Sequence, residues 1–298
     1  AKYKTTLQAP GYLEARGLDH YEYQCGRGVR VTDKTAFALR DKAAEHGADA
    51  TLLSALDEIA WTLNVRCSDV EFNPVTISYA YLSDTVNVFF VDERKIDADV
   101  RAYLKECGVE VAPYDSVKKF LEKIKDATVL LDPNKTSDTI ARSLLNCGTV
   151  YAQSPVALLK AVKNDVQIEG TRKAMERDGV ALVKLFMWIE QNVASGSITE
   201  YDVAQKVQEF RAASPLYRGE SFGLIAGYNE HGAIVHYEPE KETASTLHPE
   251  GMLLVDTGGQ YLDGTTDITR TVALGTPTEA QRHDYTLVLK GHIALGSM

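Results

Sequence analysis

The sequence lacks the features of a membrane, secreted or nucleic-acid-binding protein. Its longest uninterrupted apolar run, residues 185–189 (Leu-Phe-Met-Trp-Ile), is far shorter than the about 20 residues that cross a bilayer. Its first four residues hold no apolar core of the signal-peptide type. Lys and Arg number 32 against 42 Asp and Glu, and phosphate contacts need clustered basic residues. We therefore expect a cytoplasmic protein without a membrane or nucleic-acid partner. Because the chain does not begin with Met, we also expect it to be processed or cut from a longer protein.

Cysteines are few, and their spacing excludes two common uses. No two of the four lie close enough for a Cys-x-x-Cys zinc or redox motif. Four cysteines in 298 residues are also too few for a disulfide scaffold. The sequence therefore predicts reduced, buried thiols at Cys25, Cys67, Cys107 and Cys147.

The composition that remains is that of a folded globular protein. With 44% hydrophobic and 25% charged residues the chain can bury a core, which excludes disorder of the whole chain. A length of 298 residues suggests about two domains. The sequence pattern changes near Ser154-Pro155, so we expect one domain over residues 1–155 and a second over residues 156–298.

The first expected domain alternates helices and strands. The hydrophobic pattern predicts helices at 35–46, 56–63, 97–107 and 117–124, the second capped by Ser54 or Asp57. It predicts strands at 50–53, 109–111 and 128–131, and a hairpin of residues 76–82 and 86–91 around Ser83-Asp84. This alternation predicts an α/β domain.

The second expected domain begins with two helices and continues with strands. The first helix, over 165–191, carries an apolar stripe of Ile168, Met175, Leu182 and Ile189. The second helix, over 200–212, is capped by Thr199 and carries an apolar stripe of Tyr201, Ala204, Val207 and Phe210. We interpret both stripes as core packing. Strands are expected at 224–226, 233–236, 252–256 and 268–274, and Thr278 opens a last helix. This order predicts an α+β domain.

Asp256 and Asp267 are the first candidate functional residues. Asp256 ends a wholly apolar run, where a lone buried carboxylate would be costly. If the flanking strands form a hairpin with its turn at Tyr261-Leu262, the two carboxylates lie opposite each other, with Cβ atoms about 4.5–5.5 Å apart. They would repel unless they share a proton or bind a cation, and oxygen ligands suit a hard divalent metal. The alternative is that both residues merely flank a surface turn at Asp263-Gly264.

His236 is the second candidate, because it ends the strand expected at 233–236. Beside a metal, an imidazole can transfer a proton or donate to a substrate carbonyl. The alternative is a structural histidine. His231 lies five residues earlier and is interpreted as a loop residue.

Three segments resemble the Xaa-Pro aminopeptidases (aminopeptidase P) of the creatinase/prolidase superfamily. They are residues 227–237 (GYNEHGAIVHY), 254–261 (LVDTGGQY) and 264–271 (GTTDITRT). Residues 54–64 and 72–74 resemble the middle domain of the family's three-domain form. The resemblance implies a creatinase N-terminal-like α/β domain with a mixed sheet, followed by part of an α+β "pita-bread" catalytic domain.

The resemblance also implies a chemistry. The family holds two divalent metal ions, usually Mn with Zn or Co as alternatives, through two Asp, one His and two Glu. Asp256 and Asp267 match the two Asp, His236 matches a histidine that contacts the substrate, and Thr269 matches a residue that steadies a ligand carboxylate. The implied reaction is hydrolysis of the bond between a peptide's first residue and a following proline. A homodimer is expected, as in the family.

The chain departs from the family pattern in its ligand set. No segment before Met298 matches the ligand His or the two Glu, so we expect residues 1–298 alone to bind the metals incompletely and to show no turnover. Three alternatives remain: a prolidase that cuts Xaa-Pro dipeptides, a metal-independent amidinohydrolase of the creatinase kind, and a non-catalytic relative that binds peptides or proteins. Retention of both Asp residues argues against the last.

Overall fold

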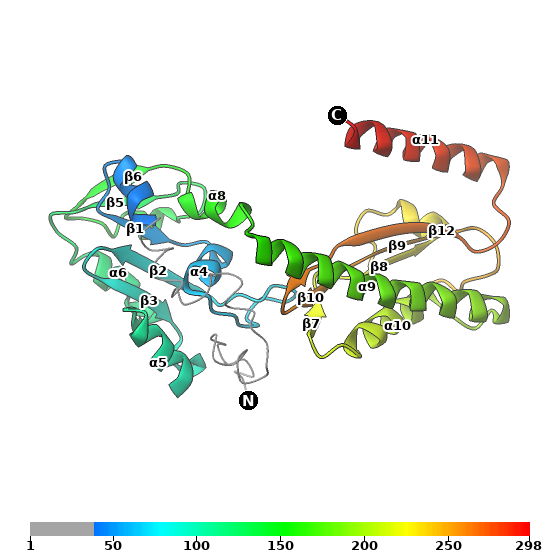
Figure 1. The fold of residues 1–298 in the computed structure, drawn as a ribbon, viewed down its shortest axis with the longest axis horizontal. Helices are drawn as coiled ribbons and strands as arrows, with labels where there is room; N and C mark the ends of the chain where they lie inside the picture. Colours follow the sequence, from blue (N-terminus) through cyan, green and yellow to red (C-terminus); the bar gives the residue numbers. More distant parts are fainter. Residues whose placement is uncertain (1–38) are drawn as a thin grey trace. The chain divides into compact units, whose positions relative to one another are not determined.

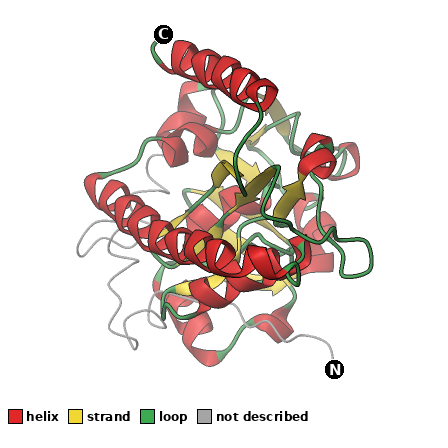
Figure 2. Cartoon of the chain, turned by 90° about the vertical axis from the view of Figure 1, so that its right-hand side faces the viewer, coloured by secondary structure: helices red, strands yellow, loops and turns green. Residues whose placement is uncertain are grey.

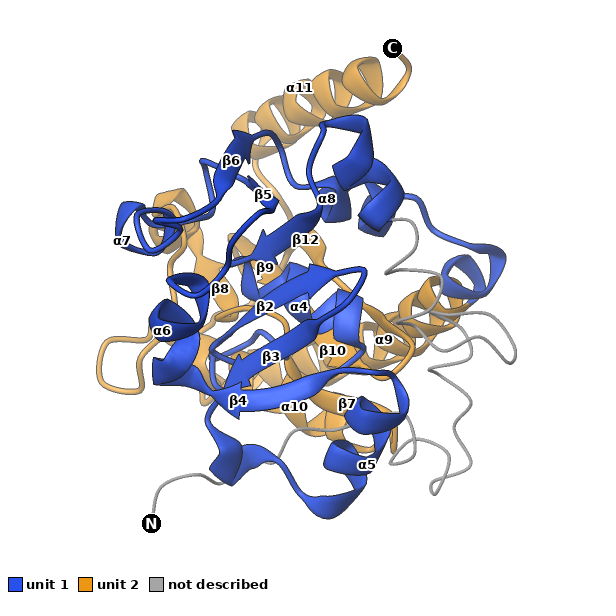
Figure 3. Ribbon diagram, turned by 90° about the vertical axis from the view of Figure 1, so that its left-hand side faces the viewer, with its two compact units in different colours: residues 1–169 blue, residues 170–298 orange. Residues whose placement is uncertain are grey.

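A computed structural model describes residues 39–298, and the chain forms two compact units, residues 1–169 and 170–298 (Figures 1 and 3). Residues 39–45 are helical, and Gly47 with φ 71° follows them in a turn, as the helix predicted at 35–46 requires. The first part of that helix and Cys25 lie outside the described residues. The division expected at 155/156 stays a prediction.

The first unit is built on a six-stranded mixed sheet in the order β4-β3-β2-β1-β5-β6. Strands β1, β5 and β6 run parallel to one another, as do β3 and β4, while β2 pairs antiparallel with β1 and β3. The predicted hairpin and mixed sheet are thus confirmed, and β6 is an addition. The strands are β1 (Ala50–Leu53), β2 (Ser78–Ser83), β3 (Asn87–Val91), β4 (Glu110–Pro113), β5 (Thr128–Leu131) and β6 (Gly148–Tyr151).

Helices cover both faces of this sheet. Side chains alternate between the two faces along each strand, and apolar side chains on both faces pack against helices. Phe89 points into the core shared with α4, α5 and α8, and the next residue, Phe90, points into the core shared with α6 and α7. Ala55 precedes α4 without a side-chain cap, so the prediction of Ser54 or Asp57 as its cap is wrong. The helices are α4 (Leu56–Leu63), α5 (Ala98–Glu106), α6 (Val117–Leu121), α7 (Asp138–Ala141) and α8 (Pro155–Ala161), with 3-10 turns η1 (Glu93–Lys95) and η2 (Tyr114–Ser116).

The second unit contains most of the long helix α9, the long helix α11 and two small sheets. Figure 2 shows the helices of the chain in red and its strands in yellow. The sheets have the orders β11-β10-β7 and β12-β9-β8 and are antiparallel throughout, which confirms the α+β class. Capping boxes at Thr199 and Thr278 start α10 and α11 as predicted. The elements are α9 (Asp165–Asn192), η3 (Val193–Ser195), α10 (Glu200–Ala212), β7 (Tyr217–Glu220), β8 (Ile225–Tyr228), η4 (Asn229–Ala233), β9 (Met252–Thr257), β10 (Gly259–Tyr261), β11 (Gly264–Thr265), β12 (Ile268–Ala273) and α11 (Glu279–Gly296).

Both predicted helix stripes are wrong in part, because charged residues occupy the buried faces. On α9, Ile168 and Met175 are 38% and 39% exposed. The residues that α9 buries are Gly170, Ala174, Asp178, Ala181, Leu182, Leu185 and Ile189. Those that α10 buries are Glu200, Val203, Val207 and Arg211. Apolar periodicity alone predicts that Asp178, Glu200 and Arg211 face solvent, whereas each of them is buried and paired inside the second unit.

The predicted strand at 233–236 is also wrong. Residues 229–233 form the 3-10 turn η4, and the apolar side chains of Ile234 and Val235 are 52% and 82% exposed. The chain folds back onto β8 so closely that a Cβ on Gly227 would lie 2.7 Å from the backbone nitrogen of Gly232. A turn this tight leaves no extended segment to join the sheet.

The thiols follow the prediction for two of the three described cysteines. Cys67 and Cys107 are buried, whereas Cys147 is only half-buried. Across residues 39–298, no helix is both long and apolar enough to cross a membrane.

Core packing of α9 gives a direct stability prediction. Leu185 is fully buried in the second unit, whereas Leu287 on α11 is 52% exposed. Leu185→Ala should lower the free energy of unfolding by about 2–5 kcal/mol, because it removes buried apolar atoms and leaves a cavity. The matched control Leu287→Ala should change it by less than about 0.5 kcal/mol. Urea unfolding followed by circular dichroism measures both, and equal effects would contradict the assigned core.

Candidate active site

Asp256 lies on β9, the central strand of its sheet, between Ile225 of β8 and Thr269 of β12. The Thr269 hydroxyl donates a 2.8 Å hydrogen bond to Asp256 Oδ1. The strands that flank the two aspartates form the predicted hairpin, but its turn is at 262–263 rather than 261–262. The partner of Asp256 is therefore Thr269, and the prediction that Asp267 lies directly opposite is wrong.

Asp267 still falls on the same face of this hairpin. It precedes Thr269 by two positions, and side chains two apart along an extended chain share a face. This makes it a diagonal neighbour of Asp256, at a typical spacing of about 7–8 Å. Asp267 is exposed and Asp256 half-buried, so both carboxylates are accessible. Two carboxylates at this spacing can bind a cation between them without touching each other.

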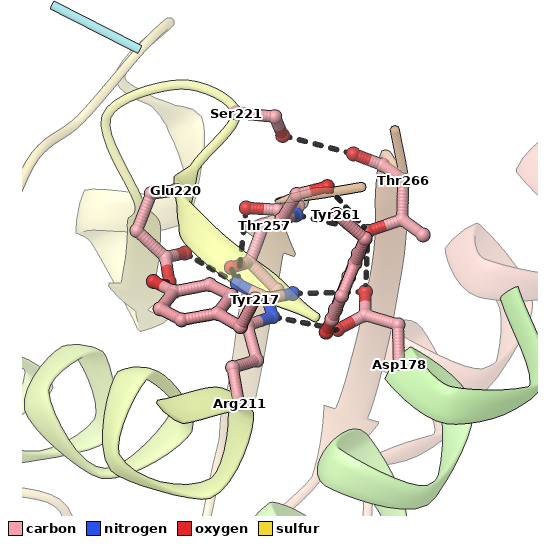
Figure 4. Close-up of polar contacts among 10 residues, drawn as sticks. Asp178, Arg211, Tyr217, Glu220, Ser221, Thr257, Tyr261 and Thr266 are labelled. Atoms are coloured by element: carbon pink, nitrogen blue, oxygen red, sulfur yellow. Dashed lines mark hydrogen bonds and ion pairs between the residues drawn. The ribbon is translucent and has the colours of Figure 1, made fainter. Parts of the chain in front are cut away.

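A buried ion pair beneath the hairpin fixes its register (Figure 4). Arg211 of α10 is 1% exposed and donates from Nε and Nη2 to the two oxygens of Asp178 on α9, at 2.6 and 3.1 Å. Its Nη1 donates to the hydroxyl of Thr257 at 2.6 Å, to the carbonyl of Gly258 at 3.2 Å and to Glu220 of β7. One guanidinium thus joins two helices to the residues that follow Asp256.

Asp178 contacts both arms of the hairpin, one residue before the turn and one after it. It accepts 2.9 Å and 2.7 Å hydrogen bonds from the hydroxyls of Tyr261 and Thr266. The two strands approach closely here: a Cβ on Gly258 would lie 2.0 Å from the Thr266 carbonyl oxygen and 2.3 Å from Ser221 Oγ. Thr257 and Thr266 are the chain neighbours of Asp256 and Asp267. The buried pair therefore positions the segments that carry both candidate ligands.

A second ion pair holds the turn itself. Arg177, next to Asp178 on α9, donates to both oxygens of Asp263 at 2.9 and 2.8 Å. Its guanidinium also lies 5.1 Å from the ring centroid of Tyr261. Such a two-point contact has a fixed geometry, so it supports the turn at 262–263.

Burial sets the protonation of the groups around Arg211. Burial raises the pKa of Glu220, and the charge of Arg211 and the hydrogen bond from Tyr217 offset this only in part. Burial first, and then its bond to Glu220, raises the pKa of the Tyr217 phenol. Burial and the charge of Asp178 raise the pKa of Tyr261 in the same way. Both phenols therefore remain hydrogen-bond donors at neutral pH.

His236 lies in the exposed turn that follows η4, with φ 57°. The structure thus brings Asp256 and Thr269 into contact and sets Asp267 on their face, but it places His236 on a separate loop segment. Asp178 and Arg211 were missed by sequence reasoning. One signal was present for Asp178: it stands four residues from both Ala174 and Leu182, on the buried face of its helix.

The donor set fits part of a metal centre. Carboxylate oxygens are the ligands that Mg, Mn and Ca prefer, and Asp256 and Asp267 would supply them. Within residues 39–298, no group of three or more His, Cys, Asp or Glu side chains is placed to hold a metal ion. The residues present therefore fit two of the five ligands that the resemblance implies. The roles of Asp256, Asp267, His236 and Thr269 stay predictions.

Removing Arg211 should destabilise the second unit. Arg211→Ala leaves Asp178 and Glu220 buried without their cation, which should lower the free energy of unfolding by about 3–5 kcal/mol. The control Arg282→Ala, an exposed arginine on α11, should have an effect below about 0.5 kcal/mol. Thermal and urea unfolding check this. An Arg211→Ala protein as stable as the control would contradict the central place of this pair.

The raised pKa of Glu220 predicts a pH dependence. The folded state holds this proton more tightly than the unfolded chain, whose carboxyl titrates near the ordinary value of 4.5. The wild-type protein therefore loses stability relative to Glu220→Gln as the pH rises from 4.5 through the raised pKa. Urea unfolding at several pH values should show that the stability difference between wild type and Glu220→Gln changes with pH. The difference between wild type and Glu209→Gln, a change at an exposed glutamate of α10, should not. A difference that does not vary with pH would contradict it.

Comparisons with known proteins place both parts of the chain. Residues 24–167 match the creatinase/prolidase N-terminal domain, and residues 169–298 match metallopeptidase family M24. The chain is 35% identical to aminopeptidase P2 of Arabidopsis thaliana over 300 residues, 90% of the chain and 42% of that protein. It is 40% identical to the Xaa-Pro aminopeptidase ApepP of Drosophila melanogaster over 277 residues, 91% of the chain and 45% of that protein. The chain thus spans less than half the length of these relatives.

Solved structures agree with this placement. The X-prolyl aminopeptidase of Caenorhabditis elegans, described as a cytosolic enzyme with a di-nuclear active site, matches with a TM-score of 0.88 at 30% identity. That match covers 98% of this chain and 47% of the other. The Xaa-Pro dipeptidase of Bacillus anthracis matches at a TM-score of 0.67 and 19% identity over 88% of this chain and 70% of its own, which shows a shared fold. The chain therefore consists of a creatinase/prolidase N-terminal domain followed by a domain of metallopeptidase family M24 with the pita-bread fold, as its motifs predict.

Proposed function

We propose that this protein is a metal-dependent Xaa-Pro aminopeptidase, which removes the first residue of peptides that carry proline at the second position. The observation that carries the proposal is the pair of accessible carboxylates on one face of the hairpin, with Asp256 held by Thr269 on the central strand. The names of the relatives at 35–40% identity support the same activity.

Each residue has a proposed role. Asp256 and Asp267 would hold two divalent metal ions, and Thr269 would orient the Asp256 carboxylate by the hydrogen bond already present. The bound metals would supply Lewis-acid chemistry at the scissile carbonyl. His236 would contact the substrate from the loop between β8 and β9. The two carboxylates supply too few ligands to close a dinuclear site, so the proposal concerns the full-length gene product.

The relatives favour an aminopeptidase over a prolidase. The aminopeptidase of C. elegans matches at 30% identity, whereas the Bacillus dipeptidase matches at 19% and informs on fold alone. We also propose Mn as the metal, a homodimer and a cytosolic location, the last by analogy with the C. elegans enzyme.

A substrate comparison tests the proposed activity. The full-length gene product, loaded with Mn, is assayed on an Xaa-Pro-Yaa tripeptide and on an Xaa-Pro dipeptide. We expect cleavage of the tripeptide at the Xaa–Pro bond. Cleavage of the dipeptide alone would favour a prolidase, and cleavage of neither peptide by the metal-loaded protein would contradict both activities.

The metal role of Asp256 can be tested on residues 1–298 themselves. Asp256→Ala should weaken Mn²⁺ binding by at least about tenfold, since loss of a supporting residue alone commonly costs 10–100-fold. The control Asp99→Ala removes an exposed carboxylate of α5 and should leave the affinity unchanged. Isothermal titration calorimetry, or the electron paramagnetic resonance signal of free Mn²⁺, measures the affinity. Equal affinity of the two variants would mean that Asp256 is not a ligand.

A further inference from the structure

Glu200 is a buried carboxylate that lies outside the site described above. It is fully buried in the first turn of α10, yet its two oxygens are surrounded by donors. Oε1 accepts from the backbone nitrogen of Tyr228 at 2.7 Å, and Oε2 accepts from the hydroxyl of Tyr237 at 2.9 Å and the backbone nitrogen of Ser245 at 2.7 Å. Nδ1 of His231 lies 3.0 Å from both oxygens.

The number of donors indicates that Glu200 is charged. A carboxylate accepts about four hydrogen bonds, and all of these positions are used here. Because an ionised carboxylate cannot donate, we assign the proton of the His231 contact to Nδ1. The start of a helix also favours a negative charge. Burial first, and then its bond to Glu200, raises the pKa of Tyr237 to about 12, so this phenol remains a donor at neutral pH.

All four partners of Glu200 lie on or beside one irregular segment. Residues 229–251 join β8 to β9, and apart from the short 3-10 turn η4 and an isolated bridge between Thr246 and Thr199 they form no helix or strand. Glu200 holds this segment where it begins, at Tyr228, at two points within it, His231 and Tyr237, and near its end, at Ser245. The His231 and Tyr237 rings also lie against each other, with centroids 4.4 Å apart. The Glu200 side chain therefore contacts the loop at several points between residues 228 and 245, and the backbone bond from Leu247 to Ile198 holds the part that follows.

We infer that Glu200 is a positioning residue, which fixes the 229–251 loop and thereby sets where His236 lies. His236 is the chain neighbour of Tyr237, and its own side chain is exposed. Its location thus depends on the bond between Tyr237 and Glu200. This inference rests on the proposed function, in which His236 contacts the substrate. Misplacing such a group by about 1 Å can lower a rate by about 100-fold.

The kinetic test is a double-mutant cycle in the Mn-loaded full-length gene product. Glu200→Gln and His236→Ala should each lower kcat/KM on an Xaa-Pro-Yaa tripeptide by at least about tenfold. The double variant should be no slower than His236→Ala alone, because Glu200 acts through His236. Mn²⁺ affinity should stay within about twofold of wild type. Effects that multiply, or a parallel loss of Mn²⁺ affinity, would overturn the inference.

Two further variants separate positioning from a general loss of folding. Tyr237→Phe removes one donor and should give a smaller effect of the same kind. Glu209→Gln makes the same chemical change at an exposed position of α10 and should leave kcat/KM unchanged. A Tyr237→Phe variant with wild-type kinetics would overturn the link between this phenol and His236.

Hydrogen–deuterium exchange tests the anchor without an assay of activity. In Glu200→Gln, amides of residues 229–245 should exchange at least about tenfold faster, while those of β12 should not change. Unchanged exchange in the loop would overturn the anchoring role. If the wild-type protein cleaves no Xaa-Pro peptide, the proposed function fails, whereas this measurement still decides whether Glu200 holds the loop.

Discussion

The second unit depends on how one buried guanidinium is satisfied. Arginine carries five N–H donors that cannot be left unpaired without water. Here Arg211 directs them to Asp178 on α9, Glu220 on β7, and Thr257 and Gly258 at the end of β9. Few arrangements of these elements satisfy all of them. The pair therefore specifies one register of the hairpin, and register decides which face each carboxylate occupies.

Helix α10 links this constraint to the neighbouring loop. Its buried face carries Glu200 in the first turn and Arg211 in the last, with Val203 and Val207 between them. A negative charge at the start and a positive charge at the end both complement the helix dipole. Glu200 holds the segment that carries His236, and Arg211 holds the hairpin that carries the two aspartates. A single helix thus supports both halves of the candidate site.

Local signals in the sequence predicted most elements but not their pairing. Capping residues such as Thr199 and Thr278 start helices through contacts three residues away, so their pattern is visible in the chain. The hairpin register depends on Asp178, which lies 83 residues from Tyr261 in the sequence, and the predicted turn was one position away from the actual turn. The apolar run at 233–235 has the pattern of a strand, but it lies in a tight exposed turn and pairs with no strand of the sheet. Asp256 and Asp267 were found from the apolar run and the hairpin spacing, and the motif resemblance then implied their roles as metal ligands.

The most direct test of this account is the Mn²⁺ affinity of Arg211→Lys in residues 1–298. Lysine keeps the charge but cannot make the two-point contact with Asp178 or reach the hairpin at the same time. Provided that circular dichroism shows a folded protein, we predict that Mn²⁺ binds at least about tenfold more weakly, although Arg211 contacts neither Asp256 nor Asp267. A folded Arg211→Lys protein with wild-type Mn²⁺ affinity would contradict the claim that this buried pair positions the metal ligands.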